Sequence, residues 1–145
     1  MSQLRLHSFI PYRLSVAANA VSRRISESYR RRFGLKIAEW RVIAILAEHE
    51  KITPQDIGNM GELDKITVSR AASALIVRGL VAQKRNPGDG RSHFLELTGE
   101  GRALYEEIAP AALRLEQELL ASFSKEEREQ LETLLRRLEM AANSP

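Results

Sequence analysis

Polar side chains suited to hydrogen bonding recur within residues 64–79. They are Lys65, Thr67, Ser69, Arg70 and Ser73. Hydroxyl, ammonium and guanidinium groups of this kind pair with the base edges that duplex DNA presents in its major groove, where one helix fits. The alternative is a solvated polar face on an ordinary amphipathic helix.

The apolar residues of the same segment predict the helix that would carry these groups. They recur at helical spacing and are Val68, Ala71, Ala72 and Leu75. Asp64 is expected to cap this helix by accepting the N–H of Ile66 or Thr67. Gly79 is expected to end it in a left-handed conformation.

A basic β-hairpin is predicted directly after this helix. Strand-forming residues lie on both sides of the turn sequence 86–90, and Arg85 and Arg91 flank the turn. We expect Arg91 to enter a minor groove, with Asp89 either orienting it or stabilising the turn. A helix followed at once by such a hairpin is typical of a recognition helix with its wing.

The preceding segment completes a helix-turn-helix. A helix is predicted over residues 37–47, and another begins at Pro54 with Thr53 as its N-cap. In the second helix, Ile57 and Met60 are expected to face the core. The resulting fold class is mainly α with a small β-hairpin wing.

Longer amphipathic helices are predicted on both sides of this unit. The first spans residues 9–33, and two later ones begin at Thr98 and at Ser124, with Pro110 bending the former. Their apolar faces could close the core of a monomer or pack against a second chain. We favour a homodimer, because a helix-turn-helix usually needs two copies to cover two half-sites.

Three regions follow from these elements. Residues 1–33 and 99–145 are expected to dimerise, and residues 34–98 to form the winged helix-turn-helix domain. Residues 1–62 hold ten basic and six acidic groups, residues 63–97 six and three, and residues 98–145 six and ten. The positive charge therefore lies in the N-terminal and central parts, which suits a polyanion-binding face.

Several chemistries are not supported by the sequence. There is no cysteine, and the three histidines, His7, His49 and His93, lie far apart. The motif that begins at His49 has Thr53 where a zinc protease needs a second histidine. We expect no enzyme, no cofactor and no metal. With no signal peptide or run near the ~20 apolar residues of a membrane span, a cytoplasmic location is expected.

Three segments together resemble the MarR family of winged helix-turn-helix transcriptional regulators. They are Trp40–Leu46, Asp64–Arg70 closed by Arg78–Val81, and Asp89–Arg91 followed by Leu95–Thr98. The resemblance implies an obligate dimer, built from the first and last two helices, on a pseudo-palindromic operator. It also implies control by a small, often phenolic or anionic, molecule bound between the dimer helices and the DNA-binding domain.

The sequence thus predicts a dimeric DNA-binding regulator, and a repressor that a small ligand releases. Tyr12, Arg13 and Trp40 would suit an aromatic acid, although Trp40 could instead be a core residue and Arg13 a surface residue. One alternative is a winged-helix module that uses the same face for protein contacts. RNA binding is a third possibility, but the recognition surface lacks aromatic residues for base stacking.

Overall fold

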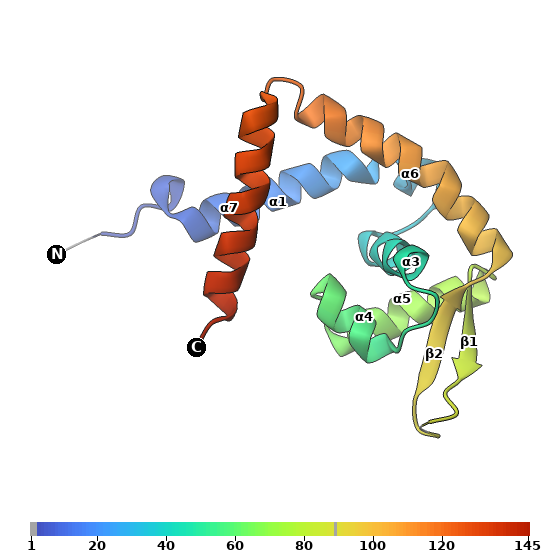
Figure 1. Cartoon of the computed structure of the whole chain (residues 1–145). Helices are drawn as coiled ribbons and strands as arrows, with labels where there is room; N and C mark the ends of the chain where they lie inside the picture. Colours follow the sequence, from blue (N-terminus) through green and yellow to red (C-terminus); the bar gives the residue numbers. More distant parts are fainter. Residues whose placement is uncertain (1–2, 89) are drawn as a thin grey trace.

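The computed structural model describes residues 3–88 and 90–145 and is mainly helical with one β-hairpin, which confirms the predicted fold class (Figure 1). In chain order the elements are a short 3-10 helix (Leu6–Ser8), α1 (Ile10–Ser26), α2 (Arg30–Phe33), α3 (Ile37–Glu48), α4 (Pro54–Gly61), α5 (Lys65–Val77), β1 (Val81–Arg85), β2 (His93–Leu97), α6 (Gly99–Leu119) and α7 (Lys125–Asn143).

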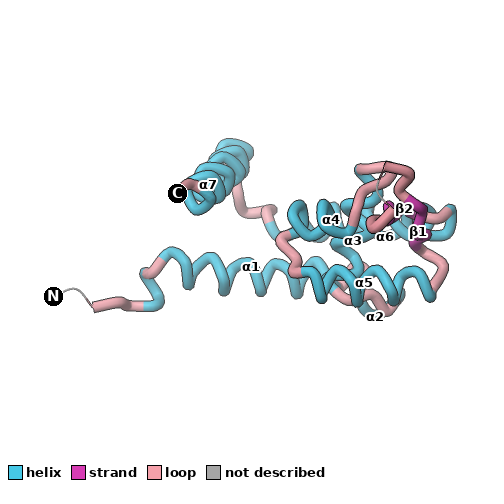
Figure 2. Tube along the Cα trace, turned by 90° about the horizontal axis from the view of Figure 1, so that it is seen from below, coloured by secondary structure: helices cyan, strands magenta, loops and turns pink. Residues whose placement is uncertain are grey.

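Two regions differ in their packing. The helices α3, α4 and α5 and the hairpin form a compact unit, which we call the winged lobe (Figure 1). The helix α6 arches from the hairpin over to α1. Beyond it, α7 and the first part of α1 extend away from the winged lobe, as the view from below also shows (Figure 2).

The core lies in the winged lobe and under the start of α6. Its most buried side chains come from helices and hairpin alike: Ile43 and Leu46 of α3, Leu75 of α5, Leu95 of β2 and Ile108 of α6. Burying one such side chain contributes roughly 1.5–3 kcal/mol. The lobe therefore closes a hydrophobic core within a single chain.

The hairpin is antiparallel, with Val81 opposite Leu97 and Arg85 opposite His93. Its second strand also bonds the loop before α4, because Leu95 N–H donates to Ile52 O at 2.8 Å and Ile52 N–H donates to Leu95 O at 3.3 Å. This bridge to Ile52 was not predicted. It fixes the base of the hairpin to the helix-turn-helix.

The predicted single helix over residues 9–33 is wrong, because α1 ends at Ser26 and α2 starts at Arg30. The hydroxyls of Ser26 and Ser28 donate to carbonyls of the last turn of α1, each at 2.6 Å. Such bonds compete with helix continuation. The break turns Tyr29 into the core, where it is buried.

Met60 does not face the core as predicted, since 52% of its surface is exposed, whereas Ile57 is fully buried. The inward position is taken by Gly61, one turn after Ile57. A Cβ atom there would lie 3.1 Å from Cδ1 of Ile45 in α3. The close approach of α4 to α3 at this glycine leaves Met60 on the outside.

The predicted helix starts are confirmed. Thr53 accepts the N–H of Asp56 at 3.2 Å, and Ser124 accepts the N–H of Glu127 at 3.1 Å. Thr98 caps α6 in the same way, and that helix continues through Pro110. Among the residues that the structure describes, none of the helices has both the length and the apolar character needed to cross a membrane.

Candidate nucleic-acid interface

One side of α5 is buried and the other is open to solvent. Val68, Ala71 and Leu75 pack inward. The exposed residues of α5 include Lys65, Ile66, Ser69, Arg70 and Ser73, and near its end Ile76 and Val77. The structure therefore brings four of the five predicted base-contacting side chains onto one exposed face.

Thr67, the fifth, is half-buried and serves the start of the helix. Its N–H donates to Oδ1 of Asp64 at 2.8 Å, and its hydroxyl donates to Oδ2 at 2.9 Å. These two bonds, the backbone one first, hold the pKa of Asp64 below its ordinary value because they favour the charged carboxylate. The predicted cap is confirmed, with Thr67 rather than Ile66 as its main donor.

A groove of about 680 Å³ runs between α4, α5 and the hairpin. Its polar lining residues are Gln55 and Asn59 from α4, Lys65, Ser69 and Ser73 from α5, and Gln83 from β1. Gln55, Asn59 and Gln83 were missed in the sequence. The i, i+4 spacing of Gln55 and Asn59 puts both amides on one face of α4 and was the available signal.

The hairpin carries basic side chains away from the lobe. Arg85 closes β1 opposite His93, and Arg91 follows the turn as an exposed residue. Asn86 shapes the turn: its Oδ1 accepts the N–H of Gly88 at 3.0 Å, and its Nδ2 donates to Oγ of Ser92 at 2.8 Å. The predicted roles of Asp89 fall on a residue outside the described part of the chain.

Side-chain bonds join α5 to α2 and join α3 to α4, the two helices that pack against α5. Arg78, at the end of α5, donates from Nη2 to Phe33 O at 2.7 Å, which joins α5 to α2. Arg41 of α3 donates from Nη1 to Gly61 O at 3.1 Å, which joins α3 to α4. Such bonds orient the exposed face of α5 on a rigid support.

The start of α6 is locked against the end of α5. The hydroxyl of Thr98 donates to Gly79 O at 2.6 Å and accepts the N–H of Gly101 at 3.0 Å. A Cβ atom at Gly101 would lie only 2.0 Å from Leu80 O, so a larger residue there would force the backbone to shift. The hairpin is thereby held between α5 and α6, and Gly79 has the predicted left-handed φ of 74°.

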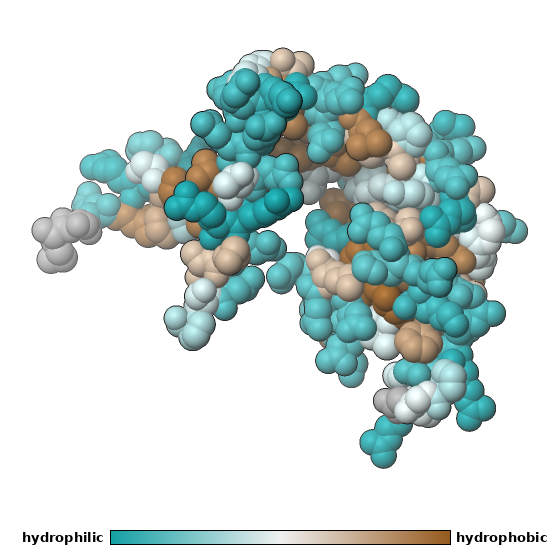
Figure 3. Space-filling view, in the orientation of Figure 1, coloured by the Kyte–Doolittle hydropathy of each residue, from teal (hydrophilic) through white to brown (hydrophobic). Residues whose placement is uncertain are grey.

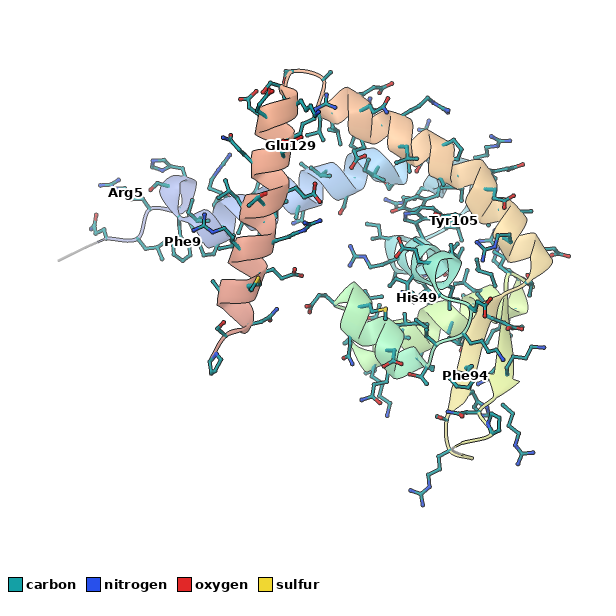
Figure 4. All side chains as sticks on the ribbon, in the orientation of Figure 1. Arg5, Phe9, His49, Phe94, Tyr105 and Glu129 are labelled. Atoms are coloured by element: carbon teal, nitrogen blue, oxygen red, sulfur yellow. The ribbon has the colours of Figure 1, made fainter. Side chains whose placement is uncertain are left out.

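The three predicted ligand-binding residues do not come together within one chain. Trp40 lies between two tyrosines, with its ring centroid 5.5 Å from Tyr29 and 5.8 Å from Tyr105. Tyr105 projects from α6 toward α3 (Figure 4). Tyr12 and Arg13 lie near the start of α1, and at 1.5 Å per residue Tyr12 is about 20 Å along the helix from Ser26.

The aromatic stack was not predicted, because its rings come from three segments distant in sequence. Burial raises the pKa of the Tyr29 hydroxyl, against the opposing effect of Arg41 and Arg30. Within residues 3–88 and 90–145, no group of acidic and histidine side chains could hold a metal ion.

A second exposed surface is apolar. Along α7, Leu131, Leu134, Leu135 and Leu138 form one stripe, and each is substantially exposed. Apolar side chains near the N-terminus are exposed as well, among them Phe9, which lies far from the hairpin residue Phe94 (Figure 4). Figure 3 shows brown, hydrophobic surface over this part of the chain. A row of exposed leucines at helical spacing indicates an interaction site.

Comparisons with known proteins agree with this architecture. The family model described as MarR family matches residues 33–92. The HTH-type transcriptional regulator YwoH of Bacillus subtilis is 30% identical over 136 residues, which cover 94% of this chain and 96% of YwoH.

Two solved structures have the same fold over nearly their whole length. The MarR/EmrR family regulator of Acinetobacter sp. ADP1 has a TM-score of 0.87 and 28% identity, covering 97% of this chain and 99% of that one. NadR in complex with 4-hydroxyphenylacetate has a TM-score of 0.79 and 27% identity, covering 95% and 97%. The chain belongs to the MarR family of transcriptional regulators.

Proposed function

We propose that this chain is a sequence-specific DNA-binding regulator that binds a pseudo-palindromic operator as a homodimer and is released by a small-molecule effector. The observation that carries the proposal is the exposed polar face of α5 beside a basic hairpin. In this proposal Lys65, Ser69, Arg70 and Ser73 contact bases in the major groove. Thr67 and Asp64 hold the start of the reading helix.

The dimensions suit this role. The helix α5 has 13 residues and is therefore about 20 Å long. A B-DNA major groove about 12 Å wide accepts such a helix, and the N-terminal residues of a recognition helix contact the base edges. Arg85 and Arg91 then lie at the flank, where a narrow minor groove attracts arginine. Asp89 remains a candidate for supporting Arg91.

We assign dimerisation to residues 1–33 and 99–145, and DNA binding to residues 34–98. The exposed leucine stripe of α7 and the apolar N-terminal residues support this division. A two-fold dimer would present two copies of α5 to successive major grooves, about 34 Å apart.

The effector proposed here is an aromatic acid. NadR, a related structure, was solved with 4-hydroxyphenylacetate. Trp40 offers an aromatic face, and Tyr12 and Arg13 would have to come from the α1 helix of the second chain, since they lie far from Trp40 within one chain. Because Trp40 is the single tryptophan, titration with aromatic acids can be followed by its fluorescence.

An effector of this class should change the Trp40 emission and release the protein from its operator over the same concentration range. Arg13→Gln should weaken both effects together, because the carboxylate loses its cation. We assign the protein no catalytic step and no cofactor, and we place its action as a repressor in the cytoplasm, where it meets the chromosome.

The test of the proposed function is selection of bound fragments from genomic DNA, followed by a gel-shift assay with and without random competitor DNA. The selected site should survive competition. Arg70→Ala should weaken specific binding by roughly 1–3 kcal/mol and relax the preference at one base pair. Arg31→Ala removes the same charge on α2 and should leave that preference intact. Equal affinity of the wild type for selected and random DNA would contradict the proposal.

A further inference from the structure

An apolar side chain lies in the middle of the polar face of α5. Ile66, the second residue of the helix, has 63% of its surface exposed. It lies opposite the buried Val68 and Leu75, and the side chains one turn further along the same face are Ser69 and Arg70. The helix therefore projects a branched hydrocarbon group among the polar side chains of Lys65, Ser69 and Arg70.

The position of Ile66 along the helix sets it apart from the two other exposed apolar residues of α5, Ile76 and Val77, which both lie at the end of the helix. Val77 has 87% of its surface exposed, but it is the last residue of α5. At 1.5 Å per residue, Ile66 and Val77 lie roughly 16 Å apart along the helix. Since the N-terminal part of a recognition helix contacts the bases, Ile66 lies at the reading end and Val77 does not.

One group on the major-groove edge of DNA is apolar, and it is the C5 methyl of thymine. Contact between that methyl and Ile66 would remove two hydrocarbon surfaces from water. An isoleucine surrounded by Lys65, Ser69 and Arg70 thus adds a reading of thymine that hydrogen-bonding side chains do not supply. No described residue of the chain covers this side of α5.

We propose that Ile66 is a specificity-determining residue that contacts the C5 methyl of a thymine in each operator half-site. This inference rests on the proposed function, in which α5 enters the major groove. The polar residues of α5 alone would not indicate that Ile66 contacts a base. The inference also predicts which chemical group on the DNA is recognised.

The experiment replaces thymines of the selected operator by deoxyuridine, one symmetric pair at a time, which removes only the methyl group. With the wild type, replacement at one position should weaken binding about fourfold per half-site. This is the contribution expected from burying one methyl group. With Ile66→Ala, the same replacement should have no effect. Val77→Ala is the matched control and should retain the wild-type response.

Three outcomes are distinguishable. The inference is supported if deoxyuridine weakens binding of the wild type and of Val77→Ala but not of Ile66→Ala. If Ile66→Ala has the same uracil profile as the wild type, or if no position responds in the wild type, the inference is wrong while operator binding stands. If the wild type does not prefer the operator over random DNA, the proposed function itself fails. Because Ile66 is exposed, circular dichroism of Ile66→Ala should match the wild type.

Discussion

The leucines of the winged lobe and those of α7 differ in burial. Leu46 and Leu75 of the lobe are buried, whereas Leu134 and Leu135 of α7 have 55% and 47% of their surfaces exposed. No residue of α7, all of which the structure describes, is buried. The lobe completes its core in one chain, whereas the leucine stripe of α7 is open to solvent in one chain, and we propose that a second chain covers it.

The two regions are nevertheless joined by side chains of α6. Arg24 of α1 bonds Glu118 at 3.0 Å, and Tyr105 stacks on Trp40 of α3. Both Arg24 and Glu118 are largely exposed, so this ion pair contributes little on its own. The stacked rings are half-buried or buried, so they connect α6 to the winged lobe more firmly than the ion pair does.

The largest effect is expected from placing charge on the leucine stripe. Leu134→Asp combined with Leu138→Asp should weaken dimerisation by at least roughly 100-fold, because each change loses about 1.5–3 kcal/mol of burial and adds a charge. Sedimentation equilibrium measures this. The helical content should remain near that of the wild type. Glu129→Ala, on the opposite face of α7, should dimerise normally.

A substitution in the core of the winged lobe should affect stability differently from one in the leucine stripe of α7. Leu75→Ala should lower the free energy of unfolding by about 2–5 kcal/mol, since Leu75 is fully buried. In urea titrations the shift should be similar at low and high protein concentration. Leu135→Ala should instead act through the dimer, so its effect should depend on concentration. A concentration-dependent loss for both variants would contradict the distinction.

The close contact between Gly101 of α6 and Leu80, the residue before β1, predicts a smaller loss of stability. Gly101→Ala should destabilise the fold by about 1–3 kcal/mol, because its Cβ would overlap Leu80 O. Gly99→Ala is the matched control, since a Cβ there meets no atom within 4 Å. Thermal unfolding of the two variants should therefore differ, and equal melting temperatures would refute the proposed lock.

The smallest effect concerns acid sensitivity of α5. Because the folded pKa of Asp64 is lowered, its contribution to stability is present above the ordinary carboxyl value of 3.8 and is lost as pH falls below it. Asp64→Asn keeps a capping side chain without the charge. The difference in melting temperature between wild type and variant should shrink as pH falls through this range. A constant difference would exclude the charge as its source.

Elements with local signals were predictable from the sequence. The helix caps at Thr53, Asp64 and Ser124 and the turn at Asn86 depend on residues within a few positions of each other, and the structure has them. The same holds for the exposed face of α5, which follows from helical spacing alone.

Features that depend on tertiary packing were not predictable. The break before Tyr29 depends on a core assembled from distant segments, and Met60 is displaced by the close approach at Gly61. The stack around Trp40 joins three separate elements. The spacing of Gln55 and Asn59 places both amides on one face of α4, but their position in the groove depends on how α4 packs beside α5.

We propose that each chain supplies one reading lobe and that operator binding needs two lobes held at a fixed spacing. Inserting five base pairs between the two half-sites turns them to opposite sides of the duplex. Fluorescence anisotropy with the wild-type protein should then show affinity reduced to that of a single half-site. Unchanged affinity for the lengthened operator would contradict the claim, because independent lobes would not sense the spacing.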